Sequence, residues 1–191
     1  HYDHLDLPSL KQLQKNNPKM VILVAQGDKA LLESHGLVHV SDFRWWQNTL
    51  VKQTEFTFTP VPHGSGRGIT GRNTSLWGGW FLNSPNLSVY HSGDTGYSKD
   101  FVATQKRMGT PDVAFIPIGA YKPRWFMKGS HINPAEAVQV AIDLQVAKSF
   151  GMHWGTFVLT DEKITKPRTL LAEELIKRQL AADFFVAPNP G

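Results

Sequence analysis

The apolar residues follow two alternating patterns along the chain, which predict strands and helices in turn. Met20–Ala25 is a continuous apolar run of strand length, and it predicts a strand covered on both faces. Glu55–Val61 alternates apolar and polar residues, as a strand with one buried face does. Further strands are predicted at Val38–Val40, Ser75–Leu82, Leu87–His91, Asp112–Ile118, Ser149–His153 and Phe184–Val186.

Helices are predicted between these strands from their start and stop signals. Asn133, followed by Pro134 and by Glu136 in the first turn, is a strong helix start, and the apolar stripe after it predicts packing against a sheet. Other helices are predicted at Leu7–Asn16, Asp28–His35, Lys99–Met108 and Thr169–Leu180. The alternation of strands and helices indicates one α/β domain over residues 1–191.

The composition is that of a globular chain, with 41% apolar and 19% charged residues among 191. The net charge of +4 is modest and no basic run exceeds two residues, so nucleic acid is not an expected partner, whereas an anionic small molecule or lipid head group fits. Cysteine is absent, which excludes disulfides and thiolate metal sites. No apolar run has the length of a membrane span. Neither the compartment, cytoplasmic or membrane-associated, nor the oligomeric state follows from the sequence.

Histidine and aspartate recur where a strand gives way to a loop, which is where α/β sheets place their chemistry. The glycines around one of them, Asp94, allow a tight turn about a buried ligand. Imidazole nitrogen and carboxylate oxygen are ligands that zinc, manganese and iron accept. Singly, each residue has a plain alternative as a hydrogen-bonded loop residue or a surface cluster. Together they form a candidate ligand set of His1, Asp3, His4, His63, Asp94 and His153.

The order of these motifs resembles that of the metallo-β-lactamase fold. Within that fold, the chain is similar to the N-acyl-phosphatidylethanolamine-hydrolysing phospholipase D group and its bacterial relatives. The segments that carry the resemblance are Ser75–Gly78, Gly93–Tyr97, Ile116–Tyr121, Pro123–Met127, His153–Phe157 and Asp183–Val186. The resemblance implies an α/β fold, the αβ/βα sandwich of this superfamily.

The first motif of that group reads His-x-His-x-Asp-His, and His1 matches its second histidine. The resemblance therefore implies that this chain corresponds to the C-terminal portion of such a protein. On this basis the first histidine and the N-terminal strands of the first sheet are expected to be missing from the chain.

The resemblance also implies a centre with two divalent metal ions, zinc as the first choice and iron or manganese as alternatives. His1 and His63, with the histidine outside the chain, are expected to hold one ion. Asp3, His4 and His153 are expected to hold the other, and Asp94 to bridge the two ions.

The activity implied is hydrolysis of a phosphodiester, in a phospholipase D-type reaction that uses water activated by two metals. Asp3, besides its ligand role, is expected to orient the nucleophile or take its proton, and Asp94 to complete the catalytic centre. His131 is predicted to donate to a phosphoryl oxygen or protonate the leaving group, with hydrogen bonding to loop carbonyls as the alternative. The predicted substrate is a lipid or small-molecule phosphodiester.

Other interpretations stay open at this point. The same fold serves lactone, amide or nucleic acid hydrolysis, and a metal-free truncated structural module is a further alternative. Lys122 and Arg124 either meet an anionic head group or lie in a solvated loop, and Arg67 is a candidate phosphate contact. Peripheral membrane contact through basic and aromatic residues is compatible with the composition. For the aromatic residues Trp77, Trp80, Trp125 and Phe126, core packing is favoured over an acyl groove.

Overall fold

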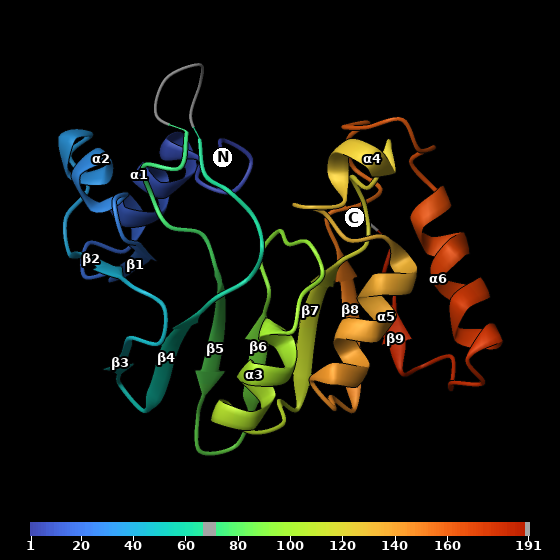
Figure 1. Cartoon of the computed structure of the whole chain (residues 1–191). Coiled ribbons are helices and arrows are strands. Elements are labelled where there is room, and N and C mark those ends of the chain that lie inside the picture. The colour runs from blue at the N-terminus through green and yellow to red at the C-terminus, as the bar shows by residue number, and fades with distance from the viewer. Residues whose placement is uncertain (67–71, 190–191) are drawn as a thin grey trace.

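The computed structural model describes residues 1–66 and 72–189, arranged as helices around a large and a small sheet (Figure 1). The strands are β1 Ile22–Ala25, β2 Val40–Phe43, β3 Asn48–Val51, β4 Thr54–Thr59, β5 Gly79–Asn83, β6 Ser88–His91, β7 Val113–Pro117, β8 Lys148–Met152 and β9 Phe185–Val186. The helices are α1 Leu7–Asn16, α2 Lys29–Ser34, α3 Asp100–Met108, α4 Arg124–Met127, α5 Pro134–Asp143 and α6 Lys166–Lys177.

The large sheet has the strand order β3-β4-β5-β6-β7-β8-β9. Neighbours from β3 to β6 pair antiparallel, and neighbours from β6 to β9 pair parallel. In Figure 1, α3 and α5 lie across one face of this sheet, with α6 beside α5. The core between them is fully buried and contains Tyr90, Phe101, Ile116, Val138 and Leu171. Because β6, β7 and β8 run parallel, their carboxyl ends meet at one edge of the sheet.

The small sheet pairs β1 with β2 in parallel and packs against α1 and α2. The Asp6 carboxylate caps α1 by accepting from Ser9 N at 2.9 Å. The buried side chain of Gln14 in α1 pairs with the backbone before β2: its amide donates to Val38 O at 2.7 Å and accepts from Val38 N at 2.9 Å. A polar side chain on the inner face of α1 is thus satisfied by the backbone just before β2.

The expectation that the first strand is covered on both faces is wrong in the described part of the chain. Ile22 and Val24 are buried, whereas Leu23 and Ala25 are only half-buried. One face of β1 packs on the two helices. Leu23 and Ala25 line a cavity of about 450 Å³ instead. The continuous apolar run therefore corresponds to a strand with one face on the helices and the other facing this cavity.

Two elements were not predicted, and two start more than two residues away from their predicted positions. β3 pairs with β4 as a hairpin, but it is largely exposed and lacks an apolar period. α4 is a single turn, too short to show one. β5 begins at Gly79 rather than Ser75, because Ser75 is engaged by the Ser65 side chain. α6 begins earlier than predicted, at Lys166, with Pro167 in its first turn.

Candidate metal centre

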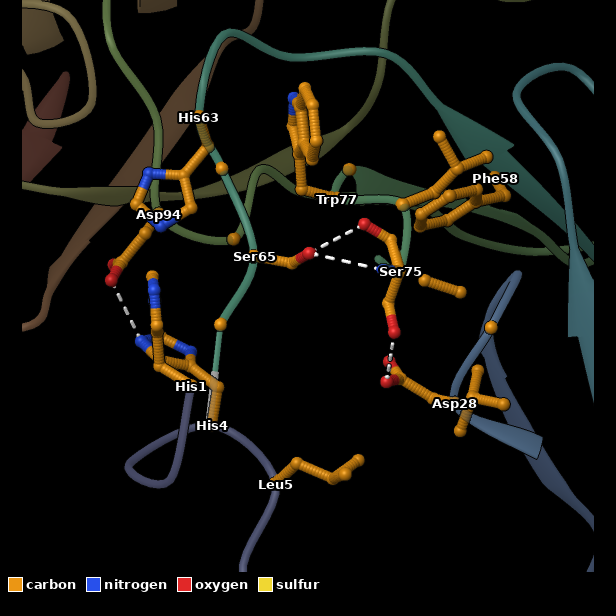
Figure 2. A pocket seen from close by; sticks show the side chains of 18 of the residues that line it. His1, His4, Leu5, Asp28, Phe58, His63, Ser65, Ser75, Trp77 and Asp94 are labelled. Atoms are coloured by element: carbon orange, nitrogen blue, oxygen red, sulfur yellow. Dashed lines mark hydrogen bonds and ion pairs between the residues drawn. The ribbon is translucent and has the colours of Figure 1, made fainter. Parts of the chain in front are cut away.

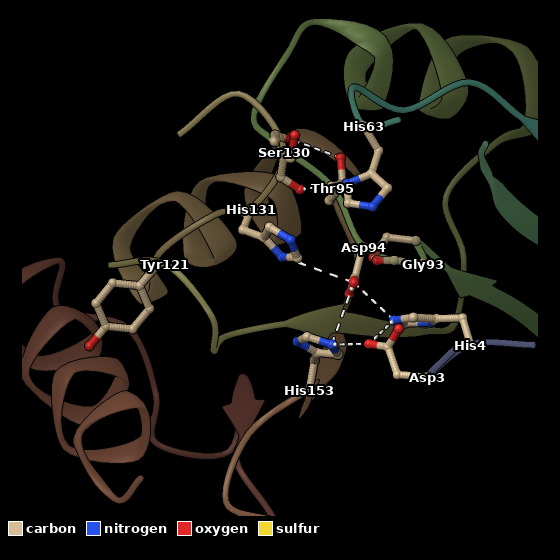
Figure 3. A network of polar contacts seen from close by, with 12 residues as sticks. Asp3, His4, His63, Gly93, Asp94, Thr95, Tyr121, Ser130, His131 and His153 are labelled. Carbon is tan, nitrogen blue, oxygen red and sulfur yellow. Dashed lines mark hydrogen bonds and ion pairs between the residues drawn. The ribbon is translucent and has the colours of Figure 1, made fainter. Parts of the chain in front are cut away.

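The candidate ligands converge from four segments far apart in the sequence (Figure 3). Asp94 follows β6, His153 follows β8, and His63 follows β4 by a short extended segment. Asp3 and His4 lie in a turn closed by His4 N and Leu5 N donating to His1 O. The predicted strand-end positions therefore meet in space, as the parallel edge of the sheet requires.

The carboxylate of Asp94 lies at the middle of the cluster, and its side chain is 4% exposed. Its Oδ2 is 2.8 Å from His4 Nε2, 3.4 Å from His153 Nε2 and 4.0 Å from His131 Nδ1. Asp3 Oδ2 lies 3.4 Å from both His4 Nε2 and His153 Nε2. Two carboxylates thus contact the same pair of imidazoles, those of His4 and His153. Asp94 approaches them from the buried side and Asp3 from the solvent-exposed side.

Two overlapping groups of side chains have the composition and spacing to hold a cation. Asp3, His4, Asp94 and His153 form one, and His63, Asp94 and His131 form the other, with ligand atoms within 4.8 Å of one another. Asp94 belongs to both, the position expected of a bridging ligand. His1 is in neither group, although its ring centroid is 5.3 Å from that of His63. His131, predicted as a hydrogen-bond or proton donor, occupies a ligand-like position beside His63, with ring centroids 5.2 Å apart.

The protonation states follow from burial and from the central carboxylate. Burial by itself raises the pKa of Asp94, but the hydrogen bond from His4 and the nearby positive charges outweigh it and hold that pKa at about 2. The same hydrogen bond raises the pKa of His4. Burial lowers the pKa of His63, and it lowers the pKa of His131 to about 4 despite the attraction of Asp94. At neutral pH the centre therefore has an ionised carboxylate with neutral His63 and His131, as metal binding requires.

Several buried polar atoms of this cluster lack hydrogen-bond partners in the described structure. They are Asp94 Oδ1, His131 Nδ1 and His153 Nδ1. Burial of an unpaired polar atom costs on the order of 1–3 kcal/mol. His131 Nδ1 is turned toward Asp94, and a divalent cation bound there would offset that cost, whereas His153 faces the two carboxylates with Nε2 and its Nδ1 lies on the other side of the ring.

The imidazole of His63 is oriented by a backbone carbonyl. Its Nδ1 lies 2.8 Å from Ser130 O, and because a carbonyl can only accept, Nδ1 carries the proton. The tautomer leaves the Nε2 lone pair free for a ligand, the arrangement that positions metal-binding histidines. His91, outside the predicted set, accepts from Gly93 N at 3.1 Å and so helps to hold the turn before Asp94.

Figure 2 shows the cavity of about 450 Å³ that leads away from the centre. His1, His4, His63 and Asp94 line one end of it. Further along, Ser75 donates its hydroxyl to Asp28 Oδ1 at 2.8 Å, in a wall that also includes the aromatic residues Phe58, Trp77 and Trp80. The cavity is therefore lined by residues of both the small and the large sheet, has polar and apolar walls, and lies next to the candidate ligands.

Arg124 has a structural role that sequence reasoning did not assign. Its guanidinium binds both oxygens of Glu136, at 3.0 and 2.8 Å, and donates to His131 O at 2.7 Å. Glu136 also accepts from Asn133 N at 3.0 Å to close the capping box. The capping signal was predicted correctly, but Arg124 is occupied in fixing the backbone of His131 and is not free for an anionic head group. Arg67, the predicted phosphate contact, lies outside the described residues.

Glu162 is a second residue that sequence reasoning missed. Its buried carboxylate accepts from Tyr121 N at 3.2 Å, from Lys122 N at 3.1 Å and from the Thr160 hydroxyl at 2.7 Å. It thereby ties the loop after His153 to the segment that precedes α4. No local pattern marks such a residue, because the two backbone N–H groups that it binds, those of Tyr121 and Lys122, lie about 40 positions away in sequence.

The substitution Glu162→Gln is expected to lower the free energy of unfolding by about 1–3 kcal/mol at neutral pH, since charge-assisted hydrogen bonds are weakened. Burial raises the pKa of Glu162, but the hydrogen bonds from Thr160 and the backbone outweigh it and give a net lowering. The wild-type contribution is therefore present above the ordinary pKa of 4.5 and lost as the pH falls through the lowered value. Denaturant unfolding at a series of pH values measures this.

Glu173→Gln is the matched control, because Glu173 is an exposed glutamate whose only described ion pair, to Lys166, spans 3.7 Å. That variant should retain the wild-type stability and its acid dependence. Equal unfolding curves for the two variants would contradict the role given to Glu162.

Comparison with known proteins decides the family. The sequence pattern of the beta-lactamase superfamily domain matches residues 1–154. The chain belongs to the beta-lactamase superfamily. The predicted α/β metallo-β-lactamase fold is confirmed by this match together with the solved structures that share the fold.

Two curated relatives in this superfamily carry phospholipase names. The chain is 36% identical over 190 residues to N-acyl-phosphatidylethanolamine-hydrolyzing phospholipase D 1 of Caenorhabditis elegans, covering 94% of this chain and 53% of the relative. It is 38% identical over 179 residues to the mitochondrial N-acyl-phosphatidylethanolamine-hydrolyzing phospholipase D of Saccharomyces cerevisiae, covering 90% of this chain and 38% of the relative. The predicted relationship to this group is confirmed, and the chain spans about half or less of these relatives' length.

Solved structures show the same fold at low sequence identity. A metallo hydrolase from the archaeon Ignicoccus hospitalis superposes with a TM-score of 0.72 at 18% identity, covering 100% of this chain and 73% of that one. An isothiocyanate hydrolase from Delia radicum gut bacteria gives 0.69 at 19% identity, covering 100% of this chain and 71% of that one. At these identities the likeness concerns the fold.

Proposed function

We propose that the protein is a metal-dependent hydrolase of phosphodiesters, with lipid-derived phosphodiesters as its substrate class. The observation that carries this proposal is the buried Asp94 carboxylate, ringed by imidazoles and shared between two ligand groups. The phospholipase names of the curated relatives support the choice of a phosphodiester.

The residues present fit two divalent ions, zinc as the first choice and iron or manganese as alternatives. Asp3, His4, Asp94 and His153 would hold one ion. His63 and Asp94 would hold the other, with the neighbouring His1 as the further predicted ligand. When bound, such a pair supplies a water of lowered pKa and positive charge that stabilises the phosphoryl oxygens.

Asp3 is suited to act on the nucleophile, because it lies at the solvent-exposed side of the ligand cluster. Its side chain is 50% exposed, while its Oδ2 contacts His4 and His153. A carboxylate there can orient an incoming water molecule and accept its proton. The more deeply buried Asp94 stays anionic throughout, since the pKa of Asp94 is held at about 2.

His131 is proposed to donate a hydrogen bond to a phosphoryl oxygen. Burial lowers the pKa of His131 to about 4, so the ring is neutral near pH 7. A neutral imidazole is an adequate hydrogen-bond donor but carries no surplus proton for a leaving group. Of the two predicted roles, the donor role is therefore favoured. The Arg124 clamp on His131 O fixes the backbone that carries this ring.

Metal loading and removal test the proposal directly. Protein loaded with excess zinc and desalted should contain about two ions per chain and hydrolyse bis-p-nitrophenyl phosphate. A chelator should abolish the hydrolysis, and added zinc should restore it. Elemental analysis and the release of nitrophenolate measure the two quantities.

A panel of lactone, amide, β-lactam and RNA substrates tests the choice of bond in the same preparation. Preferential hydrolysis of any of these would replace the phosphodiester proposal. Protein that binds no zinc, or whose hydrolysis resists the chelator, would contradict a metal-dependent mechanism altogether.

A further inference from the structure

Large apolar side chains stand exposed in two segments beside the candidate metal centre. Trp125 and Phe126 of α4 are 86% and 70% exposed, which overturns the favoured core role for these two residues. In the loop between β8 and α6, Phe157, Val158 and Leu159 are 73%, 76% and 55% exposed. We call these residues the aromatic rim. Single exposed apolar residues are ordinary, but a cluster of this size marks an interaction surface.

The two segments of the rim are held together by contacts within the fold. Glu162 joins the loop to Tyr121 N and Lys122 N, directly before α4. Phe157 and Leu159 line a small cavity with Gly119 and His153, so the loop adjoins the segment that leads into α4. Figure 1 shows α4 and the loop at the end of the sheet to which β7 and β8 point, the end at which His153 lies.

The exposed charges around the rim are mostly positive. Beside the loop segment, exposed Asp161 is balanced by exposed Lys163, and beside α4 the exposed charges are lysines. Residues 121–131 include Lys122, Arg124 and Lys128 but neither aspartate nor glutamate. Arg124 is paired with Glu136, whereas Lys122 and Lys128 are exposed. Exposed Trp and Phe side chains flanked by lysines match the chemistry of an anionic phospholipid surface, where rings enter the interface and ammonium groups meet phosphates. The same lysines would repel each other across a symmetric contact with a second copy.

We propose that the aromatic rim docks on an anionic phospholipid surface and brings the mouth of the candidate metal centre against it. No helix in the described parts of the chain is long and apolar enough to cross a bilayer. The binding itself is independent of the hydrolytic chemistry. The delivery of a lipid phosphodiester to Asp94 and its neighbours rests on the proposed function.

Sedimentation with vesicles of phosphatidylcholine and phosphatidylglycerol tests the docking. The double variant W125A/V158A should bind at least about tenfold more weakly than the wild type, because it removes two apolar side chains from the interface. Binding of the wild type should weaken with added salt and on pure phosphatidylcholine vesicles. The matched control L50A/I176A removes apolar side chains that are 68% and 78% exposed on β3 and α6, and it should bind as the wild type does.

Hydrolysis assays separate this proposal from the proposed function. W125A/V158A should hydrolyse soluble bis-p-nitrophenyl phosphate at the wild-type rate, yet act more slowly on a phosphodiester lipid in vesicles. Vesicle binding without any hydrolysis would support docking through the aromatic rim and overturn the proposed function. The docking proposal is overturned if the wild type ignores anionic vesicles, if the control loses binding equally, or if the rim instead forms a dimer that W125A/V158A dissociates.

Discussion

Replacing Asp94 with alanine is expected to lower the proposed hydrolysis of bis-p-nitrophenyl phosphate by at least about 10³-fold, because the ligand proposed to be shared by two metal ions would contribute several kcal/mol of transition-state stabilisation. The zinc content should fall in parallel. Asp94 Oδ2 lies within 4.0 Å of nitrogen atoms in His4, His131 and His153, so its removal leaves these imidazoles without the carboxylate that they share. Steady-state kinetics and elemental analysis of the same preparation measure both effects.

Asp42→Ala is the matched control, since Asp42 is an exposed aspartate on β2. It should retain wild-type activity and zinc content. Asp94→Asn, which keeps the shape but removes the charge, should resemble Asp94→Ala in metal binding. Full activity of Asp94→Ala in protein that is demonstrably folded would remove the basis of the proposed mechanism.

Replacing Gly119 with alanine is expected to lower the free energy of unfolding by about 3 kcal/mol, the upper part of the range for overpacked sites. A Cβ at this position would overlap His153 O, which is backbone and cannot rotate away. The neighbouring backbone is already constrained, since His153 has φ of 59° and Ala120 has φ of 59°. Denaturant unfolding measures the loss, and reduced zinc affinity should accompany it because His153 is displaced.

Gly129→Ala serves as the comparison, since a Cβ at Gly129 would meet no atom within 4 Å. Its stability should stay within about 0.5 kcal/mol of the wild type, as is usual for surface substitutions. If Gly119→Ala proves as stable as Gly129→Ala, the close approach of the Gly119 segment to His153 is not required for folding.

Local signals in the sequence were enough for most elements and for the ligand-bearing positions. The capping box of Asn133 and Glu136 and the Pro8 start of α1 depend on neighbouring residues only, and both form as predicted. The positions of Asp94 and His153 after predicted strands also follow from local information, while their convergence comes from the parallel pairing of β6, β7 and β8. The resemblance added the order of the motifs, and the family match confirms that likeness.

Non-local contacts explain what the sequence did not reveal. Arg124 and Lys122 look alike in the sequence as basic loop residues. Within residues 1–66 and 72–189, Arg124 forms an ion pair with Glu136 at 2.8 Å and Lys122 forms none. Trp125 and Trp77 are equally apolar, but Trp77 packs against the core while Trp125 projects outward. Which face of β1 is covered likewise depends on packing between separate elements.

By itself the sequence determined the alternation of strands and helices, the kind of donor atoms available and their places at strand ends, because these depend on side-chain type and on periods of a few residues. Only the tertiary structure decided that Asp94 is shared by two ligand groups, that the half-buried His131 has a lowered pKa, and that the aromatic rim lies beside the centre. The physical reason is that desolvation, electrostatic coupling and exposure are set by residues distant in sequence that folding brings within a few ångströms.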